Sequence, residues 1–129
     1  HLEKPADLPA FGGSAVAHRI RRLRFLDGVP CVLEEIWLDG SYARRIAPQD
    51  LSESLYLYYR QRLGMWISQV EDSVSIRPVP DWRPPEFAPA PGVQVGYFER
   101  IGFDQESRRA EFSRNWFDPA LARYVARIR

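Results

Sequence analysis

The most constraining feature of this sequence is a pair of long apolar-rich runs, residues 18–26 and 31–39, joined by Asp27-Gly28-Val29-Pro30. Both runs are rich in the β-branched and large apolar side chains that favour strands. Gly28 readily takes the positive φ that a tight turn needs. These features predict a β-hairpin, and therefore a fold built on an antiparallel sheet.

The first arm of this hairpin is strongly basic. It carries four arginines, and side chains alternate between the two faces of a strand. Arg22 and Arg24 therefore share a face with Ile20. Arg19 and Arg21 lie on the opposite face. The alternation predicts two guanidinium groups that point the same way.

The second arm holds two carboxylates, Glu34 and Glu35, in a run that is otherwise apolar on both faces. One of them must face inward, and an inward carboxylate is costly unless it meets a cation or a hydrogen-bond donor. A connection of even length would place Glu35 opposite Arg22, whereas one further looped-out residue would place Glu34 opposite Arg24. The sequence leaves both registers open. It also leaves open a solvated hairpin face with surface ion pairs.

The length and charge of the chain limit what it can be. At 129 residues it is long enough for one domain with a real core, and 45% apolar with 27% charged residues is typical of a folded globular module. The formal net charge of +1 excludes the broad positive field of a dedicated nucleic-acid-binding domain. Lys4 is the only lysine. The arginine bias favours bidentate contacts with carboxylate or phosphate, or reflects genome composition.

Cysteine and histidine content bears on compartment and on metal binding. Cys31 is the only cysteine, so the chain can form no internal disulfide and no cysteine-based zinc site, which fits a reducing compartment. His1 and His18 are the only histidines, and we expect neither a metal nor a cofactor. No apolar run approaches membrane-spanning length, so we expect a cytoplasmic protein without membrane contact. Because the first residue is His1 and not methionine, we expect a fragment of something longer.

The remaining segments supply one helix and an N-terminal extension. Residues 1–13 hold two prolines and two glycines without periodicity, and are predicted to be a linker or an extended edge ordered by docking. A first strand should begin at residue 14 or 15. Apolar residues recur at helical spacing through residues 51–64, where Ser52 or Asp50 can cap the start and Gly64 ends the run.

Three further extended runs are predicted from alternating side chains, at residues 65–78, 93–104 and 109–117. Asp118 and Pro119 break the last of them, and residues 123–129 are predicted to close the domain as a final strand. Together these elements predict an α+β domain, with an antiparallel sheet of five or six strands packed against a helix.

A proline-rich segment interrupts this pattern. Six prolines make residues 78–92 hostile to any long regular element, although residues 81–88 could hold one short helical turn. Trp82 and Phe87 are expected to pin the segment to the body of the domain.

These residues also carry a resemblance to a known family. In chain order stand a basic strand ending Arg-Leu-Arg, an Asp-Gly-x-Pro turn, a Leu-Glu-x-x-aromatic-Leu strand, a Ser-Leu-Tyr helix opening, a Val-Gly-x-x-Glu-Arg strand, Ala-Glu-Phe-Ser-Arg and a final Arg-Tyr-x-x-x-Ile. Their order and spacing over residues 16–129 resemble the UTRA domain, the effector-binding half of HutC/FarR-type regulators in the GntR family. The resemblance implies a chorismate-lyase-like fold in residues 14–129 and a homodimer. It also implies DNA contact only through an N-terminal winged helix-turn-helix outside this chain.

The resemblance assigns an effector site position by position. Arg22 and Arg24 match two arginines that in relatives bind the phosphate or carboxylate of a small effector, a role that suits a rigid fork of donors. Glu34 matches the glutamate of the Leu-Glu motif, which favours the register that pairs it with Arg24.

Three further positions complete the implied site. Ser54 matches the serine that opens the helix, and Glu111 matches the glutamate before the Phe-Ser pair, an acceptor for sugar or amine hydrogens. Phe117 stands where relatives often have a tyrosine, which counts against a sugar phosphate as effector. Without the resemblance, Ser54 is a first-turn helix residue, and Glu111 lies on a solvated strand face with Ser113 and Asn115.

Three functions are compatible with this reading. The first is a non-catalytic sensor that binds a small anionic metabolite between Arg22/Arg24 and Glu34/Glu111, and so shifts a regulator dimer between two arrangements. The second is an enzyme of the same fold that releases pyruvate from chorismate. The third is a dimerisation module with a vestigial pocket. We favour the sensor because the motifs match regulators and no nucleophile and base pair is evident.

Overall fold

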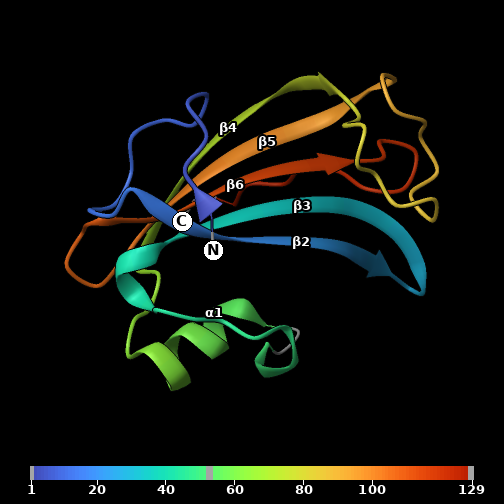
Figure 1. The fold of residues 1–129 in the computed structure, drawn as a ribbon. Helices are drawn as coiled ribbons and strands as arrows, with labels where there is room; N and C mark the ends of the chain where they lie inside the picture. The colour runs from blue at the N-terminus through green and yellow to red at the C-terminus, as the bar shows by residue number, and fades with distance from the viewer. Residues whose placement is uncertain (1, 52–53, 128–129) are drawn as a thin grey trace.

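The computed structural model describes residues 2–51 and 54–127 and contains one six-stranded antiparallel sheet of order β1-β2-β3-β6-β5-β4 (Figure 1). The strands are β1 (Leu2–Glu3), β2 (Val16–Leu26), β3 (Val29–Asp39), β4 (Gln69–Pro78), β5 (Gln94–Phe103) and β6 (Arg109–Phe117). The predicted α+β class and the size of the sheet are confirmed.

The β2–β3 hairpin forms as predicted, but in neither of the two predicted registers. Asp27 and Gly28, with φ of 50° and 78°, make a two-residue turn, so that Val29 and Pro30 already belong to β3. The pairing then shifts between Arg24 and Phe25, which leaves Cys31 as an extra, bulged residue. As a result Arg22 lies opposite Glu34, and Arg21 lies opposite Glu35.

A short helical layer covers one face of the sheet, called here the front face (Figure 1). It consists of the 3-10 turns η1 (Gly40–Tyr42) and η2 (Pro48–Asp50), the helix α1 (Leu55–Tyr58) and the π-helical turn η3 (Tyr59–Leu63). Leu55, Tyr58 and Tyr59 pack on front-face side chains such as Ile36 and Leu38.

The predicted helix over residues 51–64 therefore begins later than expected. Leu51 is extended, with ψ of 133°, because Pro48 starts a separate turn before it. The capping residue is Ser54, whose hydroxyl accepts a hydrogen bond from the Leu57 amide at 3.2 Å. Asp50 is not the cap, and Ser52 lies outside the described residues. Gly64, with φ of 63°, ends the helical segment as predicted.

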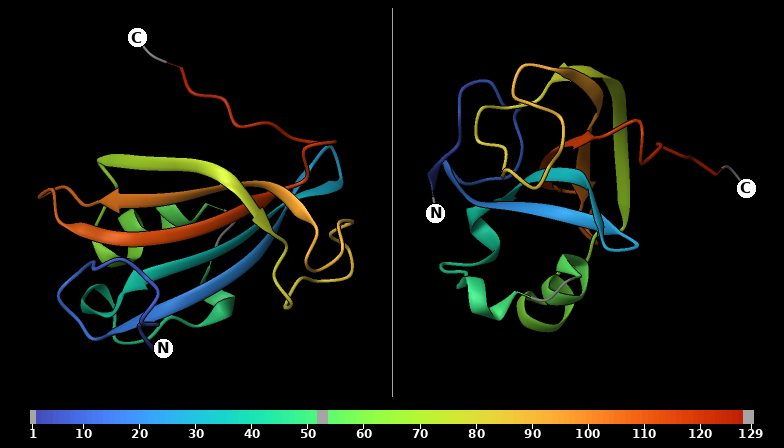
Figure 2. Two further views of the ribbon diagram at one scale, coloured as in Figure 1. Left: turned by 90° about the horizontal axis from the view of Figure 1, so that it is seen from above. Right: turned by 90° about the vertical axis from the view of Figure 1, so that its right-hand side faces the viewer.

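Two segments without long regular elements cover the opposite, back face (Figure 2). The proline-rich segment forms hydrogen-bonded turns at 80–83 and 84–87, and no helix. Phe87 is fully buried against Leu33 and Tyr97, and Trp82 packs edge-on against Trp116 with ring centroids 5.6 Å apart. Both aromatic residues pin this segment, as expected.

The N-terminal segment is docked on the back face. β1 pairs with the start of β2, and Phe11 packs in a cluster with Trp37 and Phe112. The fully buried carboxylate of Asp39 accepts hydrogen bonds from the Lys4 ammonium at 2.5 Å and from the Ser14 amide at 3.2 Å. The segment is thus an ordered edge, while the proposed boundary after residue 13 stays a prediction.

The predicted final strand is wrong within the described residues. After β6, residues 123–127 pair with no strand, and the chain leaves the sheet near β4 (Figure 2). Asp118 accepts a hydrogen bond from the Ala120 amide and makes a turn that carries the chain away from the sheet. The sixth strand is β1 instead. Among the described residues, the helices are all too short or too polar to span a membrane.

Candidate functional site

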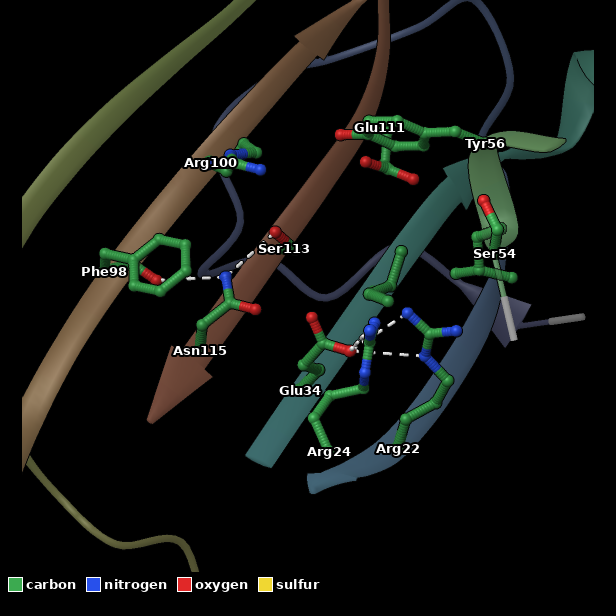
Figure 3. A pocket seen from close by; sticks show the side chains of 12 residues that line it. Arg22, Arg24, Glu34, Ser54, Tyr56, Phe98, Arg100, Glu111, Ser113 and Asn115 are labelled. Atoms are coloured by element: carbon green, nitrogen blue, oxygen red, sulfur yellow. Dashed lines mark hydrogen bonds and ion pairs between the residues drawn. The ribbon is translucent and has the colours of Figure 1, made fainter. Parts of the chain in front are cut away.

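A cavity of about 410 Å³ lies between the front face of the sheet and the start of α1 (Figure 3). Strands β2, β3, β5 and β6 supply side chains that alternate toward this face, and α1 supplies the rest. Its lining residues are Arg22, Arg24, Glu34, Ile36, Ser54, Leu55, Tyr56, Phe98, Arg100, Glu111, Ser113 and Asn115.

The hairpin forms one wall of this cavity. The Arg22 guanidinium donates to Glu34 Oε1 from Nε at 3.2 Å and from Nη2 at 3.1 Å. The Arg24 guanidinium reaches the same oxygen at 3.7 Å, diagonally across the hairpin, and its side chain is 51% exposed. Arg24, whose contact with Glu34 is long, presents N–H donors to the cavity, because a guanidinium carries five of them.

The strand β6 contributes a buried carboxyl group, Glu111, which is 3% exposed. The Tyr59 hydroxyl of η3 donates a hydrogen bond to its Oε2. Burial raises the pKa of Glu111 to about 7, and the hydrogen bond from Tyr59 opposes this rise. Near neutral pH the carboxyl group therefore exists in both protonation states, and can donate or accept a hydrogen bond in the cavity.

Arg100 on β5 is a third cavity arginine that the sequence analysis did not identify. Asp72 on β4 accepts hydrogen bonds from it, Nε to Oδ1 at 2.8 Å and Nη2 to Oδ2 at 3.0 Å. These hydrogen bonds hold the pKa of Asp72 below its usual value. Alternation along the predicted strand at 93–104 places Arg100 with Phe98. That Arg100 and Phe98 lie on the same face of the sheet as Glu111 follows only from the pairing of β5 with β6.

The structure brings five of the six predicted site residues together, namely Arg22, Arg24, Glu34, Ser54 and Glu111. The sixth, Phe117, is not among the residues that line the cavity. Its ring covers Gly96 on the neighbouring strand, where a Cβ atom would lie 2.2 Å from the ring. Ser113 and Asn115 line the cavity on β6, as their alternation with Glu111 could have indicated. Tyr56 also lines the cavity; it is the tyrosine of the Ser-Leu-Tyr helix opening, which the sequence analysis quoted without assigning this residue to the site.

The chemistry of this cavity suits an anion that also carries hydrogen-bonding groups. Three guanidiniums surround it, and Ser54, Tyr56 and Asn115 add neutral polar groups. Within residues 2–51 and 54–127, no group of three or more His, Cys, Asp and Glu side chains is placed to hold a metal ion.

Comparison with known proteins bears on the family and the fold. The sequence profile of the UTRA domain matches residues 6–122. The HTH-type transcriptional regulator SmoD of Agrobacterium fabrum (strain C58) is 53% identical over 128 residues, which cover 99% of this chain and 55% of that protein. The chain thus spans about half the length of this curated relative.

Two solved structures share the fold at low sequence identity. The ligand-binding domain assigned to a GntR-family transcriptional regulator of Bordetella bronchiseptica has a TM-score of 0.78 at 20% identity, over 88% of this chain and 72% of that one. A GntR-family transcriptional regulator of Bacillus cereus has a TM-score of 0.70 at 19% identity, over 88% and 79%. The predicted chorismate-lyase-like fold is confirmed, and the named relatives are regulators and not enzymes.

Proposed function

Since this chain belongs to the UTRA domain family, we propose that it is the effector-binding domain of a GntR-family transcription regulator of the HutC/FarR type. In this proposal the cavity binds a small metabolite that carries a phosphate or carboxylate group. Arg22 and Arg24 contact the anionic group, while Glu34, Ser54 and Glu111 hydrogen-bond the rest of the molecule.

One observation carries this proposal: Arg22 and Arg24 converge with Glu34 and Glu111 on one cavity. A carboxyl group as buried as that of Glu111 is unusual, because Glu is seldom fully buried unless it is paired. Arg24 is half exposed, and the single contact it makes with Glu34, at 3.7 Å, is long. A ligand anion can therefore approach Arg24 without breaking a short ion pair.

The strand β3 connects this cavity with the N-terminal segment. Glu34, in the middle of β3, lines the cavity, and Asp39, its last residue, contacts Lys4 and Ser14. In the proposed regulator, a homodimer in the cytoplasm, a DNA-binding domain would precede this segment. Effector binding would favour one arrangement of the dimer, provided that the effector binds the two arrangements with different affinity.

A thermal-shift screen tests the proposal with this chain. The panel contains sugar phosphates, amino acids, urocanate-like acids and fatty acids. We expect one class to raise the melting temperature, since a ligand at roughly 100 times its Kd stabilises the folded state by about 2.7 kcal/mol. Arg24→Ala should abolish that shift. Arg19→Ala, on the same strand but the back face, is the matched control and should keep it.

Two results would contradict the proposal. One is a panel in which no anionic class stabilises the chain. The other is a compound that stabilises Arg24→Ala and the wild-type chain equally, because its binding would then not use the cavity arginines.

A further inference from the structure

Arg100 is held in the cavity wall by groups that do not line the cavity. Its bidentate contact with Asp72 fixes the plane of the guanidinium, yet uses only two of its five N–H donors. Asp72 lies on β4, an edge strand whose other side pairs with no strand among the described residues. Its carboxylate makes a further contact besides the one with Arg100.

That contact comes from the C-terminal arm, residues 118–127. The Tyr124 hydroxyl donates a hydrogen bond to Asp72 Oδ2 at 2.6 Å. The Tyr124 ring packs on Phe98, with centroids 5.3 Å apart, and Phe98 itself lines the cavity. Figure 2 shows that the arm otherwise runs away from the sheet. Tyr124 is thus the point where this exposed arm meets the wall of the cavity.

We propose that Tyr124 and Asp72 are positioning residues that hold Arg100 as the third anion-contacting group of the cavity, so that docking of the C-terminal arm and binding of an anion reinforce each other. This inference rests on the proposed function, because it assigns a role to Arg100 in the same cavity. The physical basis is linkage: an anion that binds better when Arg100 is held must, in turn, stabilise the docked arm.

The chain contains a matched control for this arrangement. The Tyr42 hydroxyl donates to Asp104 Oδ2 at 2.7 Å, and Arg108 Nε donates to the same oxygen at 3.0 Å. This second tyrosine, aspartate and arginine group lies at the β5–β6 turn, and none of its members lines the cavity. Tyr42→Phe and Tyr124→Phe therefore remove the same kind of hydrogen bond, one of them away from the cavity.

The test measures two quantities in the wild-type chain and in both variants. The first, by NMR without ligand, is the rate at which the Arg100 Nε proton exchanges with water, with the signal assigned through Arg100→Lys. The second is the Kd for inorganic phosphate and for acetate, the simplest carriers of the two proposed anionic groups. Tyr124→Phe should speed the exchange at Arg100 and weaken anion binding about fivefold. Tyr42→Phe should leave both unchanged.

Each other outcome overturns a distinct claim. Unchanged exchange at Arg100 in Tyr124→Phe would show that the arm does not position this arginine. Faster exchange with an unchanged Kd would show that Arg100 is not an anion contact, and the coupling would be refuted. If the wild-type chain binds neither anion, the proposed function fails, and the coupling fails with it. The exchange rates would still show separately whether Tyr124 holds Arg100.

Discussion

Two neighbouring cross-strand pairs of the β2–β3 hairpin, Arg21 with Glu35 and Arg22 with Glu34, have the same residue types but different surroundings. On the back face, Glu35 is 5% exposed and accepts hydrogen bonds from Arg21 Nε at 3.0 Å and from the Trp37 indole at 2.9 Å. Arg21 in turn stacks over the Trp82 ring at 4.2 Å. On the front face, Arg22 and Glu34 form a pair of similar length that borders a cavity.

The difference shows what distinguishes a structural ion pair from a binding one. Glu35 accepts a hydrogen bond on each of its oxygens, from Arg21 and from Trp37, and an aromatic ring covers Arg21. The Arg114 guanidinium adds a long ion pair at 3.8 Å. The pair of Arg21 and Glu35 is costly to break, because the partners left behind stay desolvated. The front-face pair keeps access to a space that a ligand can enter. The same chemistry therefore contributes to stability on one face and to recognition on the other.

The largest expected effect is on the back face. Glu35→Ala should lower the free energy of unfolding by about 3 kcal/mol, because it leaves the Trp37 indole and the Arg21 guanidinium without their acceptor. Glu34→Ala should cost less than about 1 kcal/mol, since its arginine partners can be solvated through the cavity. Urea unfolding of both variants measures the contrast. Equal losses would remove the distinction between the two faces.

The stability of the chain should depend on pH through Glu111 on the front face. Because burial raises the pKa of Glu111 from 4.5 to about 7, the folded chain holds this proton more tightly than the unfolded chain. The favourable contribution is complete below pH 4.5 and is lost as the pH rises to about 7. Stability should fall by about 3 kcal/mol across that window because of this group.

Glu111→Gln isolates this contribution, since glutamine keeps the size of the side chain and does not titrate. Unfolding measured from acid to neutral pH should show the fall in the wild-type chain, and a flatter profile in the variant. A profile of the same slope in both proteins would mean that Glu111 does not hold the proton.

The smallest effects concern the arginines themselves. Arg21→Ala should cost about 1 kcal/mol, from its ion pair and its contact with the Trp82 ring. Arg24→Ala should change stability by less than about 0.5 kcal/mol, because its side chain is half exposed and its contact with Glu34 is long. Thermal unfolding of the two variants without ligand provides the comparison. A larger loss for Arg24→Ala would make that arginine structural.

Much of this contrast could be predicted from the sequence, because strand alternation is a local property. Alternation alone places Arg22 and Arg24 on one face and Arg21 on the other, as the structure shows. The register could not be predicted, because it depends on a two-residue turn followed by a bulge at Cys31. We expected only one of Glu34 and Glu35 to face inward. In the structure both side chains are largely buried, on opposite faces of the sheet.

The parts of the cavity that escaped prediction depend on contacts between distant segments. Arg100 enters it only because β5 pairs with β6, and Tyr56 only because the helix starts at Leu55 and not at Leu51. Residues 123–129, whose first part belongs to the C-terminal arm, were expected to form a final strand. The arm's departure from the sheet, with Tyr124 as a contact to Asp72, is a tertiary feature that no local pattern encodes.

The most direct test of the central claim is an NMR titration of the isotopically labelled chain with the panel compound that raises the melting temperature most. The measured quantities are the chemical shifts of the arginine Nε–H groups. If the ligand binds in the front-face cavity, the shifts at Arg22 and Arg24 should saturate, and those at Arg19 and Arg21 on the opposite face should not change. Shifts confined to the back-face arginines, or none at either face, would contradict the assignment of this cavity as the binding site.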